Sequence, residues 1–137
     1  MRFVDTNVLL YAISNDAEEL AKAAVANELL RSADLGLSVQ VLQEFYVQAT
    51  RESRANRLTD EQAAGLVDAF RRFAVQETTI EVALAAISSK QRFGISYWDA
   101  AILEAARSLS CEVVLSEDLS DGQDYAGVRV ENPFNDC

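Results

Sequence analysis

Four acidic side chains are the residues best suited to chemistry, although they lie far apart in the chain. Asp5 ends a short apolar stretch, Asp118 follows an apolar run ending at Leu115, and Glu44 and Asp99 lie in segments of helical periodicity. No lysine or arginine is adjacent to any of them. Carboxylates brought together repel one another, and a hard divalent cation relieves that repulsion. Ligation by oxygen alone selects Mg²⁺ or Mn²⁺ over zinc.

Each acid also has a purely structural interpretation. Asp5 could cap the helix that follows it. Glu44 could be a solvated residue at the border of an apolar helix face, and Asp118 could be a turn acid. Ser96 and Asp99 have the spacing of a helix capping box. No single position decides between structure and chemistry, whereas the four acids together indicate a metal site.

The composition excludes several catalytic schemes and raises one objection. The 137 residues contain no histidine, which excludes Ser-His-Asp and Cys-His hydrolases and His-ligated zinc. The formal net charge is −10, and such a surface should repel nucleic acid. The basic residues fall in clusters that either line one rim or are scattered in solvent: Arg51, Arg54, Arg57, Arg71, Arg72, Lys90 and Arg92.

Strand and helix patterns alternate along the chain, which predicts an α/β fold. Strands are expected at residues 2–5, 36–39, 74–77, 112–115 and 128–130. Helices are expected at residues 7–14, 16–33, 39–51, 79–93 and 96–109, with another starting at a Thr59–Gln62 capping box. This pattern predicts one domain with a mainly parallel sheet covered on both faces. Ligands gather at the carboxyl ends of such strands, where Asp5 and Asp118 would lie.

Other features favour a cytoplasmic globular protein. No apolar run reaches the ~18–20 residues of a membrane span, so we expect no membrane association. The two cysteines, Cys111 and Cys137, do not resemble a disulfide framework. Four aromatic residues could stack on nucleic acid bases or belong to the core, and the core is the expectation because two of them lie on or near apolar helix faces: Tyr11, Tyr46, Tyr97 and Trp98.

Four motifs in order resemble the PIN-domain ribonucleases, most closely the VapC-type toxins of bacterial toxin–antitoxin pairs. They are "VDTNVLLYA" at 4–12, "SVQVLQEFYVQATR" at 38–51, "SYWDAAILEAA" at 96–106 and "LSEDLSDGQDYAGVRVENPF" at 115–134. The resemblance implies a three-layer α/β/α sandwich and RNA cleavage that depends on Mg²⁺ or Mn²⁺. It also implies a homodimer and a cognate antitoxin encoded beside this chain.

The catalytic residues implied by the resemblance are Asp5, Glu44, Asp99 and Asp118, with Ser116, Asn7 and Asp121 in supporting roles. Asp5, Asp99 and Asp118 would be direct or water-mediated metal ligands, and Glu44 a further ligand or the group that orients the attacking water. Ser116 and Asn7 would hold carboxylates or waters by hydrogen bonds.

Three other functions are possible for an acidic α/β domain of this length. A receiver domain would need paired acids after its first strand and a late lysine, but no lysine follows Lys90. A phosphatase with an aspartyl nucleophile would normally carry an acid at position 7, which is Asn7. The remaining rival is a PIN-like module that binds RNA or protein without cutting.

Overall fold

The computed structural model describes residues 1–137, and its centre is one six-stranded sheet. The strands lie in the order β3-β2-β1-β4-β6-β5. All neighbouring strands pair in parallel except β5, which is antiparallel to β6. The strands are β1 (Arg2–Val4), β2 (Leu35–Ser38), β3 (Ala74–Gln76), β4 (Val113–Leu115), β5 (Asp124–Tyr125) and β6 (Val128–Glu131).

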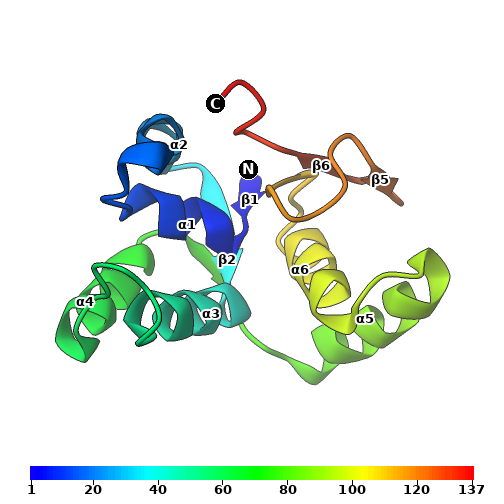
Figure 1. The fold of residues 1–137 in the computed structure, drawn as a ribbon. Helices are drawn as coiled ribbons and strands as arrows, with labels where there is room; N and C mark the ends of the chain where they lie inside the picture. The colour runs from blue at the N-terminus through cyan, green and yellow to red at the C-terminus, as the bar shows by residue number, and fades with distance from the viewer.

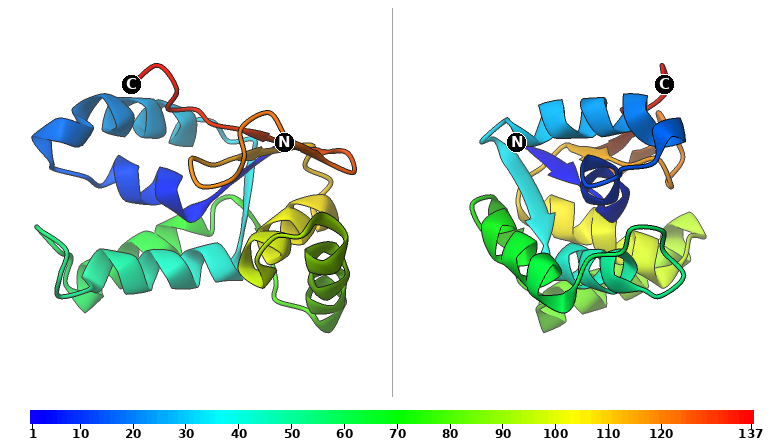
Figure 2. Two further views of the ribbon diagram at one scale, coloured as in Figure 1. Left: turned by 45° about the vertical axis from the view of Figure 1, so that its right-hand side comes forward. Right: turned by 60° about the vertical axis from the view of Figure 1, so that its left-hand side comes forward.

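Helices cover both faces of the sheet. In Figure 1, α1 to α4 lie to the left of and below β1, whereas α5 and α6 lie to the right, below β5 and β6, and the turned views in Figure 2 show the same two groups of helices. The helices are α1 (Thr6–Ala12), α2 (Leu20–Leu30), α3 (Val39–Thr50), α4 (Asp60–Phe70), α5 (Ile80–Phe93) and α6 (Tyr97–Ser108). The α/β/α sandwich with a mainly parallel sheet is therefore confirmed.

Polar side chains fix where the helices around the sheet edge begin. The Asp5 carboxylate accepts a hydrogen bond from the Thr6 backbone N–H at the start of α1. Ser38 caps α3 and Ser96 caps α6 in the same way. Gly94 ends α5 with a left-handed φ of 65°, so α6 can begin three residues later. These caps set the register of the helices that carry the acids.

The core fills the space between the sheet and the helix layers. The β1 residues Phe3 and Val4 and the β4 residue Val114 are fully buried. Phe45 of α3 packs edge-on against Phe70 of α4, with ring centroids 5.3 Å apart. The continuous apolar runs of the strands are thus explained by burial on both faces.

One expected element was wrong and one strand was missed. Residues 16–33 do not form one helix, because the Asp16 carboxylate accepts from the Glu18 N–H and starts a 3₁₀ turn, Ala17–Glu19, before α2. The strand β5 was not predicted. It forms a hairpin with β6 through Ala126 and Gly127, whose φ values of 53° and 95° suit a two-residue turn.

The aromatic residues are less buried than expected. Tyr46 is 38% exposed and Trp98 is 64% exposed, so neither belongs to the core. Tyr97 is half-buried, whereas Tyr11 packs its ring edge-on against Phe134. An apolar helix face is buried only where another layer covers it, and no other layer covers Tyr46 or Trp98.

Candidate functional site

The site lies at the carboxyl ends of β1 and β4, where the strand order changes direction. The chain runs from β1 to β2 and β3 on one side, whereas β4 lies on the other side of β1. Asp5 follows β1 directly, and its N–H donates to the Leu115 carbonyl of β4 at 3.0 Å. Asp118 lies three residues beyond the end of β4. Both acids are therefore at the topological switch point, where open α/β sheets bind ligands.

One cavity of about 290 Å³ collects all four predicted acids. Asp5 comes from the end of β1, Glu44 from α3, Asp99 from the first turn of α6 and Asp118 from the loop after β4. The cavity contains no lysine or arginine, and its complete lining is Asp5, Thr6, Asn7, Leu10, Gln40, Glu44, Gln48, Trp98, Asp99, Ile102 and Asp118. The structure thus brings the four carboxylates together without a cationic side chain between them.

The Ser116 hydroxyl makes three hydrogen bonds beside Asp5. It donates to Asp5 Oδ2 at 2.7 Å. Ser116 Oγ also accepts from Asn7 Nδ2 at 3.2 Å and from the Asp118 backbone N–H at 3.1 Å. One donor and two acceptor positions are all that a hydroxyl offers, so Ser116, which is fully buried, is saturated. Asn7 uses its second amide hydrogen on Asp118 Oδ2 at 3.2 Å.

Burial raises the pKa of Asp5 from its usual 3.8 to about 6. The hydrogen bonds from Ser116 and from the Thr6 backbone lower the pKa, and the negative charges of Asp118 and Glu44 raise it again. The side chain is only 7% exposed and has no ion-pair partner. The fold therefore maintains a buried carboxylate beside two like charges.

Glu44 is held by two residues that the sequence did not single out. Thr6 Oγ1 donates to Glu44 Oε2 at 2.8 Å, and Gln40 Nε2 donates to Oε1 at 3.0 Å. Gln40 lies one turn before Glu44 on α3, a spacing that could have indicated the pair. Thr6 is 38 positions away, and nothing in the sequence pointed to that contact. The half-buried Glu44 is thus a positioned residue and not a solvated one.

Asp99 does not complete the capping box that its spacing allowed. Its backbone N–H donates to Ser96 Oγ at 3.1 Å, so Ser96 is the cap. The Asp99 carboxylate itself makes no hydrogen bond back to Ser96 and lines the cavity. The structural interpretation of Asp99 therefore explains only its backbone.

Asp121 does not line the cavity. Its two carboxylate oxygens accept from the Asn132 N–H and from Asn135 Nδ2, both at 2.8 Å. These hydrogen bonds lower the pKa of Asp121. Asp121 therefore ties the loop after β4 to the segment after β6, and its supporting role in the site stays a prediction.

The clustered basic residues lie outside the lining of the acidic cavity. Arg72 donates to the Leu30 carbonyl, Arg54 to the Leu10 carbonyl, and Arg71 pairs with Asp68. None of the seven clustered lysines and arginines lines the acidic cavity. The objection raised by the net charge therefore remains at the site itself.

The donor set of the cavity fits a hard divalent cation in its chemistry. All the candidate ligands are carboxylate oxygens, and the buried one among them, Asp5, lacks a compensating positive charge. As the side chains stand, no group of three or more acidic, thiol or imidazole residues has the spacing of a formed metal site. The fit therefore rests on charge and ligand type.

Comparison with known proteins shows the family of the chain. The profile of the PIN domain family matches residues 2–120. This chain belongs to the PIN domain family. No curated protein matches the sequence. None of the helices of this PIN domain combines the length and apolar character needed to cross a bilayer.

Solved PIN domain structures have the same fold at low sequence identity. A toxin–antitoxin complex from Klebsiella pneumoniae is similar with a TM-score of 0.69 and 20% identity, covering 98% of both chains. VapC20 from Mycobacterium tuberculosis, a sarcin-ricin loop cleaving toxin, is similar with a TM-score of 0.67 and 20% identity, covering 86% of this chain and 90% of that chain. DNA-bound VapBC from Salmonella typhimurium is similar with a TM-score of 0.65 and 22% identity, covering 96% of this chain and 97% of that chain.

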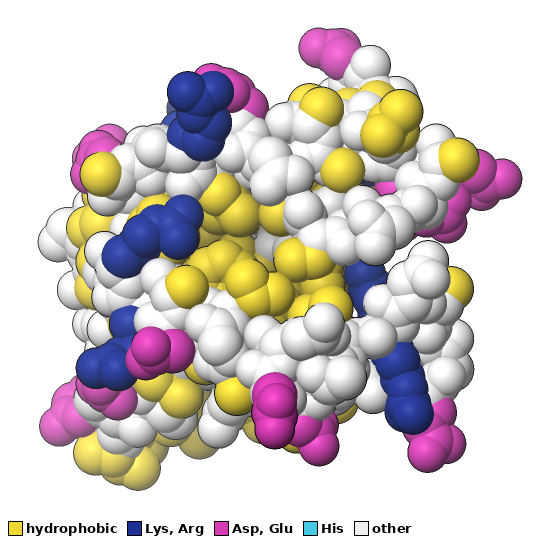
Figure 3. Space-filling view, turned by 90° about the vertical axis from the view of Figure 1, so that its left-hand side faces the viewer, with side chains coloured by type: hydrophobic (Ala, Val, Ile, Leu, Met, Phe, Trp, Pro, Cys, Tyr) yellow, Lys and Arg dark blue, Asp and Glu magenta, His cyan; other side chains and the backbone are white.

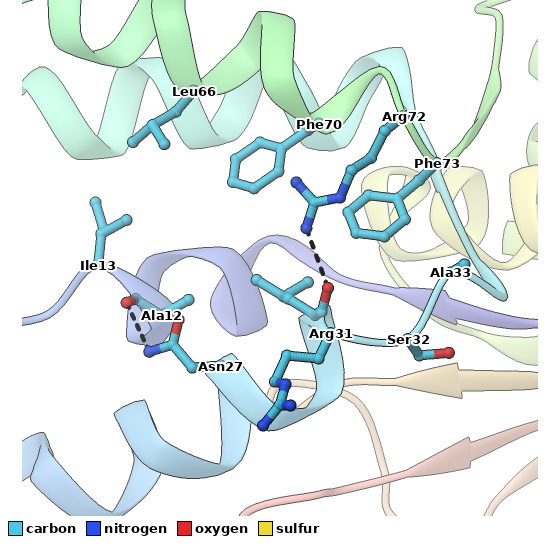
Figure 4. Close-up of a pocket in the computed structure, with 11 residues that line it drawn as sticks. Ala12, Ile13, Asn27, Arg31, Ser32, Ala33, Leu66, Phe70, Arg72 and Phe73 are labelled. Carbon is cyan, nitrogen blue, oxygen red and sulfur yellow. Dashed lines mark hydrogen bonds between the residues drawn. The ribbon is translucent and has the colours of Figure 1, made fainter.

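A second, apolar hollow of about 580 Å³ lies between α4 and the α1–α2 pair. Figure 3 shows it as a hydrophobic depression with basic side chains beside it, and Figure 4 shows Leu66 and Phe70 facing Ile13 across it. Arg72 reaches over one end to the Leu30 carbonyl, and the exposed Arg31 lies nearby. We call this hollow the α1–α4 groove.

Proposed function

We propose that this PIN domain is a metal-dependent endoribonuclease that hydrolyses RNA phosphodiester bonds with Mg²⁺ or Mn²⁺. The observation that carries the proposal is the convergence of four carboxylates from four elements on one cavity without a cationic partner. A bound ion of this kind would neutralise phosphate charge and lower the pKa of an attacking water.

The residues of the cavity divide into ligands and positioning groups. Asp5, Asp99 and Asp118 offer oxygen ligands, and Glu44 would be a further ligand or orient the water. Ser116 and Asn7 hold Asp5 and Asp118 in place by hydrogen bonds, and Thr6 and Gln40 do the same for Glu44. Each oxygen of Asp5 accepts one hydrogen bond and retains a lone pair for an ion.

The test is RNA cleavage by the purified chain with Mg²⁺ or Mn²⁺, with EDTA, and with an Asp5→Asn variant. We expect cleavage only with wild-type protein and metal. Asp136→Asn, which changes an exposed acid away from the cavity, is the matched control and should cleave normally. Cleavage that survives both EDTA and Asp5→Asn contradicts the mechanism. No cleavage of any RNA favours the alternative of a non-cleaving RNA- or protein-binding module.

We further propose that this nuclease is a toxin held by an antitoxin in the α1–α4 groove. The groove is apolar and has Arg31 and Arg72 beside it, on a chain of net charge −10. A segment of the antitoxin with an apolar face and acidic residues would complement the apolar groove and its two arginines. Leu66→Glu should abolish co-purification with the protein encoded by the neighbouring gene, whereas Leu20→Glu, on an exposed part of α2, should not. Retained co-purification of Leu66→Glu contradicts this location.

The homodimer and the cytoplasmic location belong to the same proposal. Ile80, Leu84 and Ile87 of α5 are exposed at the i, i+4 and i+7 spacing of one helix face, which suits a subunit contact. Sedimentation should show a dimer for wild type and a monomer for Leu84→Glu, with Leu20→Glu again as the control. A dimer that persists in Leu84→Glu contradicts this face as the interface.

A further inference from the structure

Trp98 is a large aromatic side chain left in solvent beside the acidic cavity. It is 64% exposed, and it is the single tryptophan of the chain. Trp98 is one of the residues that line the cavity containing Asp5 and Asp99. A tryptophan so exposed gains little from folding, so its presence at the mouth of a candidate active site calls for a ligand with a matching apolar face.

The same side chain borders a second, smaller hollow of about 70 Å³. This hollow lies among α3, the segment after β3 and the start of α6, and its polar lining residues include Gln43, Gln76, Glu77 and Thr78. Trp98 therefore borders both the acidic cavity and a hollow whose lining is mainly uncharged. A nucleotide likewise joins a charged phosphate to an uncharged base.

Trp98 is held in place by its neighbours. The Tyr97 ring meets it edge-on, with centroids 5.0 Å apart and planes at 81°. Its backbone carbonyl accepts from Gln40 Nε2 at 3.3 Å. The same nitrogen of Gln40 donates to Glu44 Oε1. Gln40 therefore connects the backbone of Trp98 to the carboxylate of a candidate catalytic acid.

We propose that Trp98 is a stacking platform for an unpaired RNA base next to the phosphate that enters the acidic cavity. This inference rests on the proposed ribonuclease function. Stacking on an aromatic ring requires a base freed from a duplex, so the substrate class is single-stranded RNA or a loop. Stacking also supplies affinity without positive charge. It therefore answers the objection that a chain of net charge −10 with no basic residue in the cavity should repel RNA.

The test uses the fluorescence of this single tryptophan in the wild-type chain, with EDTA present to prevent cleavage. Titration with a mixed-sequence single-stranded oligoribonucleotide should quench the emission, and a fully paired RNA duplex of the same length should not. Labelled-RNA anisotropy should show binding weakened by roughly 10- to 100-fold in Trp98→Ala, with most affinity retained in Trp98→Phe.

Tyr46→Ala is the matched control. Tyr46 is also an exposed aromatic residue on the chain, but it lies outside the acidic cavity, so its removal should leave RNA affinity unchanged. Thermal unfolding should give similar midpoints for wild type and Trp98→Ala, because the side chain is mostly in solvent. In cleavage assays Trp98→Ala should raise KM more than it lowers kcat.

Three outcomes overturn the inference. The first is the absence of quenching by any single-stranded RNA, and the second is wild-type RNA affinity in Trp98→Ala. The third is emission that changes with protein concentration alone, together with a shift to monomer in Trp98→Ala, which would assign the ring to a subunit interface. Quenching by RNA without metal-dependent cleavage would instead refute the proposed nuclease function and would still support stacking of a base on Trp98.

Discussion

The Ser116 hydroxyl and the Asp5 carboxylate, 111 positions apart in the chain, share a 2.7 Å hydrogen bond at the floor of the acidic cavity. Ser116→Ala removes this bond and leaves Asn7 without one of its acceptors. We expect cleavage to fall by about 10- to 100-fold, as for other residues that orient a metal ligand. Cleavage rates of the folded variant at saturating Mg²⁺ or Mn²⁺ measure the loss. Ser120→Ala, at an exposed serine of the same loop, should match wild type, and an equal loss there would refute the role of Ser116.

Asp5 should destabilise the metal-free fold as the pH rises. Its pKa is about 6 in the folded chain and 3.8 when unfolded, so the folded state binds more protons between these values. Stability is therefore lost as the pH rises through this window, by roughly 3 kcal/mol in all. Asp5→Asn keeps an N-cap residue and removes the charge.

Thermal unfolding in EDTA at pH 4 and at pH 7.5 measures this effect. The midpoint of Asp5→Asn should exceed that of wild type by more at pH 7.5 than at pH 4. Asp136→Asn, an exposed acid, controls for the general effect of removing one carboxylate. If the wild-type and Asp5→Asn midpoints differ by the same amount at both pH values, the Asp5 pKa is not raised in the fold.

A bound metal ion should reverse this destabilisation. An ion that binds only the folded state stabilises it by about 2.7 kcal/mol at 100 times its Kd, which corresponds to several degrees in Tm for a domain of this size. We expect Mg²⁺ or Mn²⁺ to raise the Tm of wild type and of Asp136→Asn, but not that of Asp5→Asn. The same rise in Asp5→Asn would place the ion elsewhere.

Glu104 should contribute to stability and not to catalysis. It is buried on α6, where it accepts from Ser89 Oγ at 2.7 Å and pairs with Arg107 at 3.0 Å. Arg107 also donates to the Tyr125 and Ala126 carbonyls, so the network joins α5, α6 and the β5–β6 hairpin. Glu104→Ala leaves buried groups unpaired and should lower the free energy of unfolding by about 2 kcal/mol.

The matched control for Glu104 is an exposed ion pair of the same spacing. Glu28 and Arg31 are 75% and 79% exposed, so Glu28→Ala should cost less than about 0.5 kcal/mol. Urea unfolding gives both values. Cleavage per folded molecule should be unchanged in both variants, and equal losses of stability would show that burial of Glu104 contributes nothing.

The sequence predicted those elements that have a periodic apolar pattern or a clear start and end. Apolar runs located β1, β2 and β4, and alternation with helical segments predicted the parallel sheet. An acid that follows a strand must lie at the sheet edge, so Asp5 and Asp118 were predicted to meet, and the cavity contains both. Their roles in metal binding and catalysis stay predictions.

The sequence did not reveal what depends on contacts between distant segments. The hydrogen bond from Thr6 to Glu44 has no local signature. The periodicity of α6 shows which side of the helix is apolar, but it does not show that no layer covers Trp98. The two-residue strand β5 is too short for any periodic pattern, and only its pairing with β6 defines it.

The four carboxylates of the cavity are spread along the chain, at residues 5, 44, 99 and 118, so the ribosome adds them one after another. A growing polypeptide therefore carries at most three of them until position 118 has been joined. Ser116, which holds the first carboxylate in place, is also added late. Under the proposed function, a nascent chain therefore lacks a complete cutting site until residue 118 has been added.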